Sequence, residues 1–400
     1  MATAEWKPAK LDELGFVGRG KSRHRPRNAA FLYGGRYPFF QTGDIKAANF
    51  HLTEYSQTYS EEGLAQSKLW KPGTLCITIA ANIAESAILG IEGCFPDSVV
   101  GFVADPDKAD VRFVKYYMEI LKLQMQSVSR GTTQDNLSLD KLLTFDFLVP
   151  PLPVQRRIAG ILSAYDELME NSHRRIRLLE AMARALYREW FVHFRFPGHN
   201  TKSSASDNSP DFVSGMLGDL CGLTKDTYDD AVHSELPLLD LAHMPSRTLA
   251  PQDTGHPSEL TTSRIVFKKN DTLFGAIRCY LHKVVAAHYS GVTNTSVLVL
   301  RPKRPCFRSL LAIIASDAET IRWAEAQSTG TKMPVINWGI FQKMPAPVPS
   351  AGLAQEFENI AGPMLDQIGV HAIQIQNLRR TRDLLLPRLL SGQVQIPNTN

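Results

Sequence analysis

The chain contains an internal repeat, and this repeat constrains its fold more than any other feature of the sequence. KPGTLCITI (71–79) aligns with KNDTLFGAI (269–277), and the stretch 126–150 aligns with 326–349. Further blocks follow in the same order at a nearly constant offset, with Ser98 falling on Ser296. A chain of 400 residues is long enough for the two copies to be separate domains. We therefore expect two globular domains with the same fold.

Each copy combines short β-rich runs with helical stretches. LCITIAA, SVVGFVA and TSVLVLRP have the composition of buried strands, and helices are predicted near 111–129 and 307–326. The hydrophobic content of 44% is sufficient for real cores. The sequence thus predicts the α+β class, with two pseudo-symmetric globular domains at 1–152 and 212–352.

A long helical stretch, placed at 153–197, follows the first copy. Its apolar residues recur at alternating steps of four and three, which is the period of a coiled coil. Between Ile158 and Trp190 it contains no Pro, and Gly160 is the only Gly. The predicted seam consists of Ile158, Leu162, Tyr165, Met169, Ser172, Ile176, Leu179, Ala183, Leu186 and Trp190.

A second helical stretch, placed at 353–400, follows the second copy. Gly362-Pro363 predicts an early kink, and Pro387 predicts an interruption near the end. Two helices of matched length can pack antiparallel, and the Ser/Asn/Asp-rich segment 198–211 is typical of a flexible linker. The predicted seam consists of Phe357, Ile360, Met364, Ile368, His371, Ile375, Leu378, Arg382, Leu385 and Leu389. His371 is expected to pack, because no other metal-ligating residue stands beside it at zinc spacing.

GFVGRGKS (15–22) matches the phosphate-binding pattern G-x-x-x-x-G-K-[ST]. Such a loop needs a buried strand before it and a helix directly after it. The preceding KPAKLDEL is polar, and Pro26 falls in the first turns of the required helix. The second copy, CGLTKDT (221–227), lacks the pattern. We therefore interpret the stretch as a surface turn, and nucleotide hydrolysis stays as a rival hypothesis that an ATP or GTP titration would test.

The net charge is only +4, but five basic residues gather in RGKSRHRPR (19–27). This cluster is either a solvated loop or a set of phosphate contacts to nucleic acid, and its composition alone favours neither. The five cysteines are scattered without a C-x-x-C pair, which is typical of reduced cytosolic thiols. No apolar run reaches membrane-spanning length and no signal peptide is visible, so the sequence predicts a cytoplasmic protein without a membrane partner.

The order of the motifs resembles the specificity (S) subunits of type I restriction–modification systems. The resemblance covers essentially the whole chain. One segment, VPSAGLAQEF (348–357), departs from the family pattern because it lacks the PPL of the first copy. The motifs that show the resemblance lie at the ends of the two repeats. They are VPPLPVQRRIAGILSAYDELME (149–170), REWFVHFRFPGH (188–199) and RDLLLPRLLSGQV (382–394).

The resemblance implies two target-recognition domains, each reading one half of a bipartite, asymmetric sequence in double-stranded DNA. It implies that the two antiparallel helices hold these domains apart, set the spacer and dock two modification (methyltransferase) subunits. Those subunits would supply S-adenosylmethionine and methylate adenine, and two restriction (translocase) subunits would add ATP and Mg for cleavage. The chain itself would carry no cofactor, no metal and no catalytic residue, and it would associate with the prokaryotic nucleoid when bound to DNA.

Candidate DNA-binding residues follow from their position in predicted loops and from the side chains that bind phosphates and base edges. The loops SRGTTQDN and STGTK are the stronger candidates, because they recur around a Gly turn. In the first domain the candidates are Arg19, Lys21, Ser22, Arg23, Arg25, Arg27, Arg130, Thr132, Thr133, Gln134 and Asn136. In the second domain they are Lys225, Thr227, Arg278, Lys283, Thr331, Lys332 and Asn337.

Catalytic motifs are missing from the sequence. It contains no methyltransferase N/D-P-P-[YF] loop, no G-x-G-x-x-G, no H-E-x-x-H and no G-x-S-x-G. A DNA reader needs none of them. A second rival hypothesis, a scaffold built on the coiled coil, predicts that sequence-selective DNA binding is absent even with the methyltransferase present.

Overall fold

The protein is described here from a computed structural model that covers residues 6–23, 26, 29–48, 50–130, 137–197, 212–251 and 253–394. At 129–130 and 212–213 only the backbone is described. The chain divides into two compact units. Unit 1 comprises 1–170 and 378–400, and unit 2 comprises 171–377. The predicted linker 198–211 lies outside the described residues.

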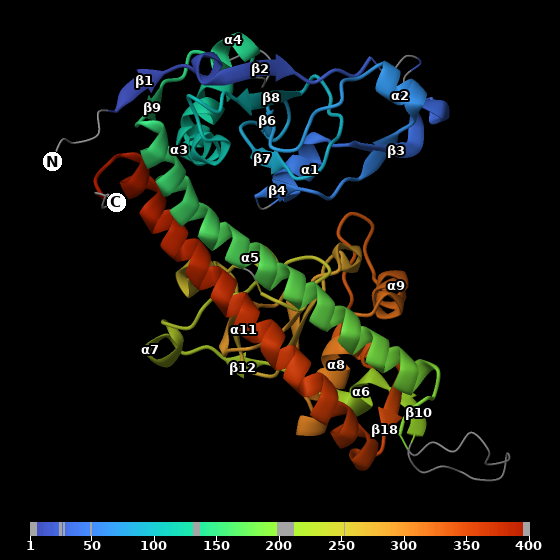
Figure 1. The fold of residues 1–400 in the computed structure, drawn as a ribbon. Coiled ribbons are helices and arrows are strands. Elements are labelled where there is room, and N and C mark those ends of the chain that lie inside the picture. The colour runs from blue at the N-terminus through green and yellow to red at the C-terminus, as the bar shows by residue number, and fades with distance from the viewer. Residues whose placement is uncertain are drawn as a thin grey trace. The chain divides into compact units, whose positions relative to one another are not determined.

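Unit 1 is built around a five-stranded sheet in the order β2-β8-β6-β7-β4 (Figure 1). All neighbours are antiparallel except β4 and β7. These strands are β2 (Gly15–Arg19), β4 (His51–Leu52), β6 (Leu75–Thr78), β7 (Ser86–Leu89) and β8 (Val99–Ala104). Two further pairs are β1 (Lys7–Ala9) with β9 (Phe147–Val149) and β3 (Tyr33–Phe39) with β5 (Gln57–Tyr59). The α-helices of the globular part are α1 (Thr42–Ala47), α2 (Glu61–Ala65), α3 (Val111–Arg130) and α4 (Leu139–Leu142).

Unit 2 has a four-stranded sheet in the order β11-β17-β14-β15. These strands are β11 (Cys221–Thr224), β14 (Thr272–Gly275), β15 (Val284–Ala286) and β17 (Val297–Pro302). A second sheet is β12 (Asp226–Thr227), β13 (Arg264–Phe267) and β16 (Gly291–Asn294), and a third is β10 (Phe212–Met216) with β18 (Pro345–Pro349). The short helices are α6 (Leu217–Leu220), α7 (Asp230–His233), α8 (Arg308–Ala315), α9 (Ala318–Ala326) and α10 (Trp338–Phe341).

The predicted repeat is confirmed at the level of strand register. In unit 1, β2 pairs Gly15 with Ala104, and in unit 2, β11 pairs Cys221 with Pro302 at the corresponding place. The central pairs also correspond: β6 with β8 in unit 1 matches β14 with β17 in unit 2. Ser138 and Asn337 cap α4 and α10, because each side chain accepts a hydrogen bond from the third residue of its helix. The two halves therefore share one topology.

One helix of the repeat differs between the units. The helix predicted near 307–326 is two helices, α8 and α9, whereas α3 of unit 1 is continuous over 20 residues. The prediction of a single helix is therefore wrong. Asp317 explains the break, because its carboxylate accepts the Glu319 N–H at 2.9 Å and so begins a new helix.

The two long helices are α5 (Leu152–Tyr187) and α11 (Ala351–Leu390), and α5 continues as a π-helical turn over Arg188–Val192. In unit 1, the first turns of α5 share a core with the last turns of α11. In unit 2, Trp190 and Phe191 after α5 pack against Phe357 near the start of α11. The helices are therefore antiparallel, as predicted (Figure 1).

Most residues of the predicted seam are buried or half-buried. Ile158, Leu162, Met169, Ile176, Ile368 and Ile375 are buried, and Tyr165, Leu179, Leu186, Met364, Leu378 and Leu385 are half-buried. The seam position assigned to Ile360 is wrong, because 43% of this residue is exposed. The reason is that α11 also covers the globular core of unit 2, where Phe357, Ala361 and Leu365 form the buried face.

The proline predictions for the second helix fail in part. α11 runs without interruption from Ala351 through Pro387 to Leu390, so the predicted break at Pro387 is wrong. Pro363 also lies inside the helix. Both prolines are exposed, so water can bind the carbonyl groups that lose their intrahelical partners.

Candidate nucleic-acid interface

The GFVGRGKS stretch is a strand followed by an extended segment. Gly15–Arg19 forms β2 and pairs with β8, so the expected surface turn at this place is wrong. Gly20 is required by close packing, because a Cβ there would lie 2.2 Å from the Pro96 carbonyl oxygen. Backbone bonds to β8 and to Phe95 hold the segment down. No helix begins at Lys21, so a phosphate loop is not formed.

The basic residues after β2 present side chains to solvent. Arg19, Lys21 and Arg23 are exposed, and within the described chain none of them has an ion-pair partner. Ser22 is half-buried, and its hydroxyl is hydrogen-bonded to Tyr59. Arg25 and Arg27 lie outside the described residues. The assignment of this cluster to phosphate binding stays a prediction.

In unit 2 the structure describes the predicted STGTK loop, residues 328–332. Thr329 and Val335 exchange two backbone hydrogen bonds, and Gly330 takes a φ of 104° that favours glycine. Thr331 and Lys332 stand exposed on this turn. The Arg278 N–H donates to the Pro334 carbonyl at 2.8 Å, so the structure brings the turn beside the β14–β15 loop. The corresponding residues Thr132, Thr133, Gln134 and Asn136 of the first copy lie outside the described residues, and the side chain of Arg130 is not described.

Two other candidates of unit 2 have structural partners. The Asn337 side chain caps α10 by accepting the Ile340 N–H at 3.0 Å. The Lys283 ammonium donates to the Leu241 carbonyl. Any contact that they make with DNA would have to compete with these bonds.

Lys225 and Thr227 are exposed and lie at β12, in a different sheet from the Arg278 loop. The structure thus groups Arg278, Thr331 and Lys332, and it does not place Lys225 and Thr227 among them.

Two glutamates of α5 accept hydrogen bonds from residues of the globular parts. In unit 1, Glu170 accepts the backbone N–H of His51 at 3.0 Å and lies 3.2 Å from its Nδ1. In unit 2, Glu180 accepts the Thr248 hydroxyl at 2.6 Å and the Leu249 N–H at 2.7 Å. The hydrogen bond to Glu170 raises the pKa of His51. Each carboxylate therefore fixes one globular part to its own stretch of the same helix.

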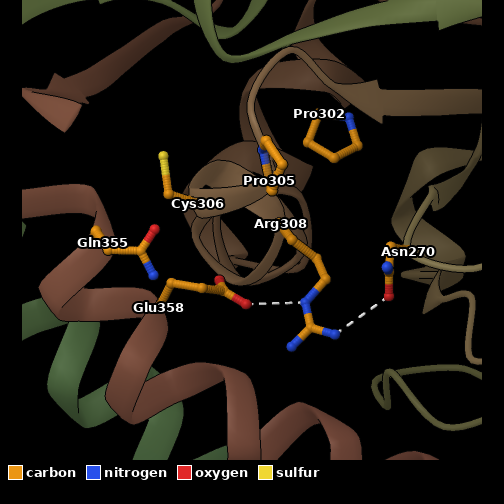
Figure 2. Close-up of a pocket in the computed structure, with 7 residues that line it drawn as sticks. All are labelled: Asn270, Pro302, Pro305, Cys306, Arg308, Gln355 and Glu358. Carbon is orange, nitrogen blue, oxygen red and sulfur yellow. Dashed lines mark hydrogen bonds and ion pairs between the residues drawn. The ribbon is translucent and has the colours of Figure 1, made fainter.

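A pocket of about 360 Å³ lies in unit 2, between β17, α8 and the start of α11. Figure 2 shows seven of the residues that line it. The Arg308 guanidinium lies in it and bonds Glu358 at 2.9 Å, Asp366 at 2.8 Å and Asn270 at 3.1 Å. Two carboxylates thus neutralise Arg308, the only arginine among the described residues that line this pocket. The pocket therefore offers a poor site for an anionic ligand such as a nucleotide.

The described residues contain no group of three or more His, Cys, Asp or Glu side chains that could hold a metal ion. None of the described helices combines the length and the apolar character that a bilayer crossing requires. All five cysteines are buried and unpaired, as expected for free thiols.

Comparison with known proteins shows which proteins this chain resembles. The sequence model of the type I restriction modification DNA specificity domain matches residues 3–181. The type I restriction enzyme MjaIX specificity subunit of Methanocaldococcus jannaschii is 21% identical over 98% of this chain and 94% of its own length. The chain is therefore similar to type I specificity subunits, and the DNA specificity domain is matched in residues 3–181.

Two further matches are also to type I specificity subunits. A putative type I restriction enzyme specificity subunit of Haemophilus influenzae is 28% identical over 40% of each chain. The crystal structure of the S subunit of a type I restriction–modification system from M. genitalium has a TM-score of 0.62 at 15% identity and covers 100% of this chain and 98% of its own. The latter shows that the fold of the whole chain is similar to that of the S subunit in this crystal structure.

Proposed function

We propose that this specificity subunit reads DNA with two separate surfaces, one on each globular part. Each surface recognises one half of a bipartite, asymmetric sequence in double-stranded DNA. The observation that carries the proposal is the repeated strand register, which gives the chain two copies of one scaffold whose loops carry different side chains. Two different loops on one scaffold suit the reading of two different half-sites.

The two long helices would set the spacer between the half-sites and dock two methyltransferase subunits. Exposed apolar side chains on the helices support a docking role, because an isolated helix pair would expose them to water. They include Leu168, Leu178 and Met182 on α5 and Val370, Ile373 and Leu384 on α11.

Catalysis and its cofactors are proposed for the partner subunits. S-adenosylmethionine would bind to the methyltransferase for adenine methylation, and ATP with Mg would bind to the two restriction subunits. The chain would act without a cofactor of its own, in the prokaryotic cytoplasm and at the nucleoid when bound to DNA.

The function is tested by binding and methylation assays on the chain co-purified with its methyltransferase. A DNA library with randomised bases is offered, and methylated molecules are sequenced. The proposal predicts enrichment of a two-part sequence with a fixed spacer. Uniform methylation, or complex formation without any sequence preference, would support the scaffold hypothesis instead.

A further inference from the structure

The loops between β6 and β7 in unit 1 and between β14 and β15 in unit 2 share one backbone frame. They comprise 79–85 and 276–283, so the second is one residue longer. Three backbone hydrogen bonds recur at corresponding positions. In unit 1 they are Thr78 N to Glu85 O, Ile79 N to Ser98 O and Leu137 N to Ile79 O, and in unit 2 they are Gly275 N to Lys283 O, Ala276 N to Ser296 O and Ile336 N to Ala276 O.

Both loops place non-glycine residues in the left-handed region at the same two positions. The third residue after the first strand is Ala81 in unit 1, with φ 50°, and Arg278 in unit 2, with φ 52°. The second residue before the next strand is Ala84, with φ 62°, and His282, with φ 53°. Such residues cost free energy and persist only where the surrounding structure fixes them. The frame is therefore closely defined in both units.

Arg247 joins the frame of unit 2 from another segment. It is also left-handed, with φ 63°, and its N–H donates to the His282 carbonyl at 2.9 Å. Its counterpart in unit 1 follows from the pairing that leads into β7 and β15. Because Phe50 accepts the Ile88 N–H and Leu249 accepts the Ala286 N–H, Arg247 corresponds to Ala48. Unit 2 thus carries two arginines where unit 1 carries two alanines.

Arg247 and Arg278 also differ from the other arginines of unit 2 in having no partner for their side chains among the described residues. Seven arginines lie between 212 and 350. Arg264, Arg301, Arg308 and Arg322 form ion pairs, and Arg304 lies over the ring of Phe307. Arg247 and Arg278 are exposed, and their guanidinium groups have no ion-pair or hydrogen-bond partner in the part of the chain that the structure describes.

We propose that Arg247 and Arg278 are base-reading residues of unit 2, with guanine as the base class that each guanidinium recognises. Planar guanidinium groups bind the O6 and N7 acceptors of guanine in a bidentate manner. Phosphate contacts carry no sequence information, so a duplicated domain has reason to keep them in both copies. Base contacts must differ when the half-sites differ. The two units keep the same backbone frame in these loops, but unit 2 has arginines where unit 1 has alanines. This inference rests on the proposed function.

The test uses the full chain in complex with its methyltransferase and the randomised library described above. Arg278→Ala and Arg247→Ala are compared with Arg278→Lys and with Arg322→Ala. An alanine suits the left-handed position, because Ala81 occupies it in unit 1. The Arg322 variant is the matched control, because that exposed arginine is paired with Glu319 on α9.

We expect each alanine variant to lose preference for guanine at one position of one half-site, by roughly ten- to a hundred-fold. The other half-site and the Arg322→Ala profile should stay unchanged. Arg278→Lys should not restore the preference, because an ammonium lacks the bidentate fork.

Two results would overturn the inference. One is that the wild-type complex is sequence-selective and both alanine variants keep its base preference unchanged. The other is equal weakening of all sequences with a salt slope reduced by about one, restored by lysine, which would make these residues phosphate contacts. A wild-type complex without any base preference would instead overturn the proposed function. Thermal unfolding of every variant confirms that the fold is intact.

Discussion

Units 1 and 2 share corresponding strand pairs in their central sheets but attach these sheets to the long helices by different charged groups. In unit 1, Asp166 of α5 is 2% exposed, accepts the Tyr116 hydroxyl at 2.5 Å and pairs with Arg382 of α11. At the corresponding place in unit 2, the side chain of Asp366 of α11 is 55% exposed and pairs with Arg308 of α8. A duplicated scaffold has thus kept its strand register while the charges that hold it have changed place.

The attachment of the two globular parts also differs in its polar packing. Gln155 of α5 is 1% exposed, and its amide binds the carbonyls of Lys108 and Pro150 and the N–H of Asp110. Gln355, its counterpart in the repeat, is exposed and bonds only Asn359 among the described residues, beside the pocket of Figure 2. The comparison indicates that α5 is bound more tightly to its globular part at this position than α11 is.

The largest expected effect concerns Asp166. Asp166→Ala leaves Arg382 and the Tyr116 hydroxyl without their buried partner, and breaking a buried ion pair costs about 3–5 kcal/mol. Asp366→Ala removes an exposed partner from Arg308, which keeps Glu358, and should cost less than about 1 kcal/mol. Denaturant unfolding measures both. Equal losses would show that the two attachments do not differ.

The second effect concerns the two glutamines. Gln155→Ala leaves one buried N–H and two carbonyls without their side-chain partner, so the free energy of unfolding should fall by about 1–3 kcal/mol. Gln355→Ala removes an exposed amide and should change it by about 0.5 kcal/mol or less. The same unfolding experiment decides the point, and a larger loss for Gln355→Ala would reverse the comparison.

The smallest expected effect is the pH dependence of the His51–Glu170 pair. The hydrogen bond to Glu170 raises the pKa of His51 above 6.5, so its stabilisation is complete below that value and is lost as the pH rises through the folded pKa. Burial opposes ionisation of Glu170, but the bonds from His51 prevail and lower its pKa below 4.5, so its own contribution is lost as the pH falls through that lowered value.

Glu170→Gln should therefore destabilise most near pH 5 to 6 and least above pH 8, by a few tenths of a kcal/mol because the pair is partly exposed. Glu180 has no titrating partner in its bonds to Thr248 and Leu249, so Glu180→Gln should not show this profile. If the difference in the free energy of unfolding between wild type and Glu170→Gln does not change with pH across that range, His51 does not contribute to the attachment.

The repeat, the long helices and most of the seam could be predicted because they depend on patterns within short windows. The break before α9 is not predictable from the apolar pattern, because this pattern runs across Asp317, the residue that caps the helix. The side chain of Asn337, a predicted DNA-binding residue, caps α10, and its contact with DNA stays a prediction. Hydrogen bonds to residues distant in sequence fix the left-handed backbone conformations of Arg247 and Arg278, so the local sequence does not predict these conformations.

The central claim is that one scaffold, present twice, reads two independent half-sites. The most direct test replaces residues 212–347 by the matching segment of another specificity subunit and sequences the DNA that the resulting complex methylates. The account predicts a new sequence in one half of the site, with the other half and the spacer unchanged. A change in both halves, or in neither, from a folded and methylating complex would contradict it.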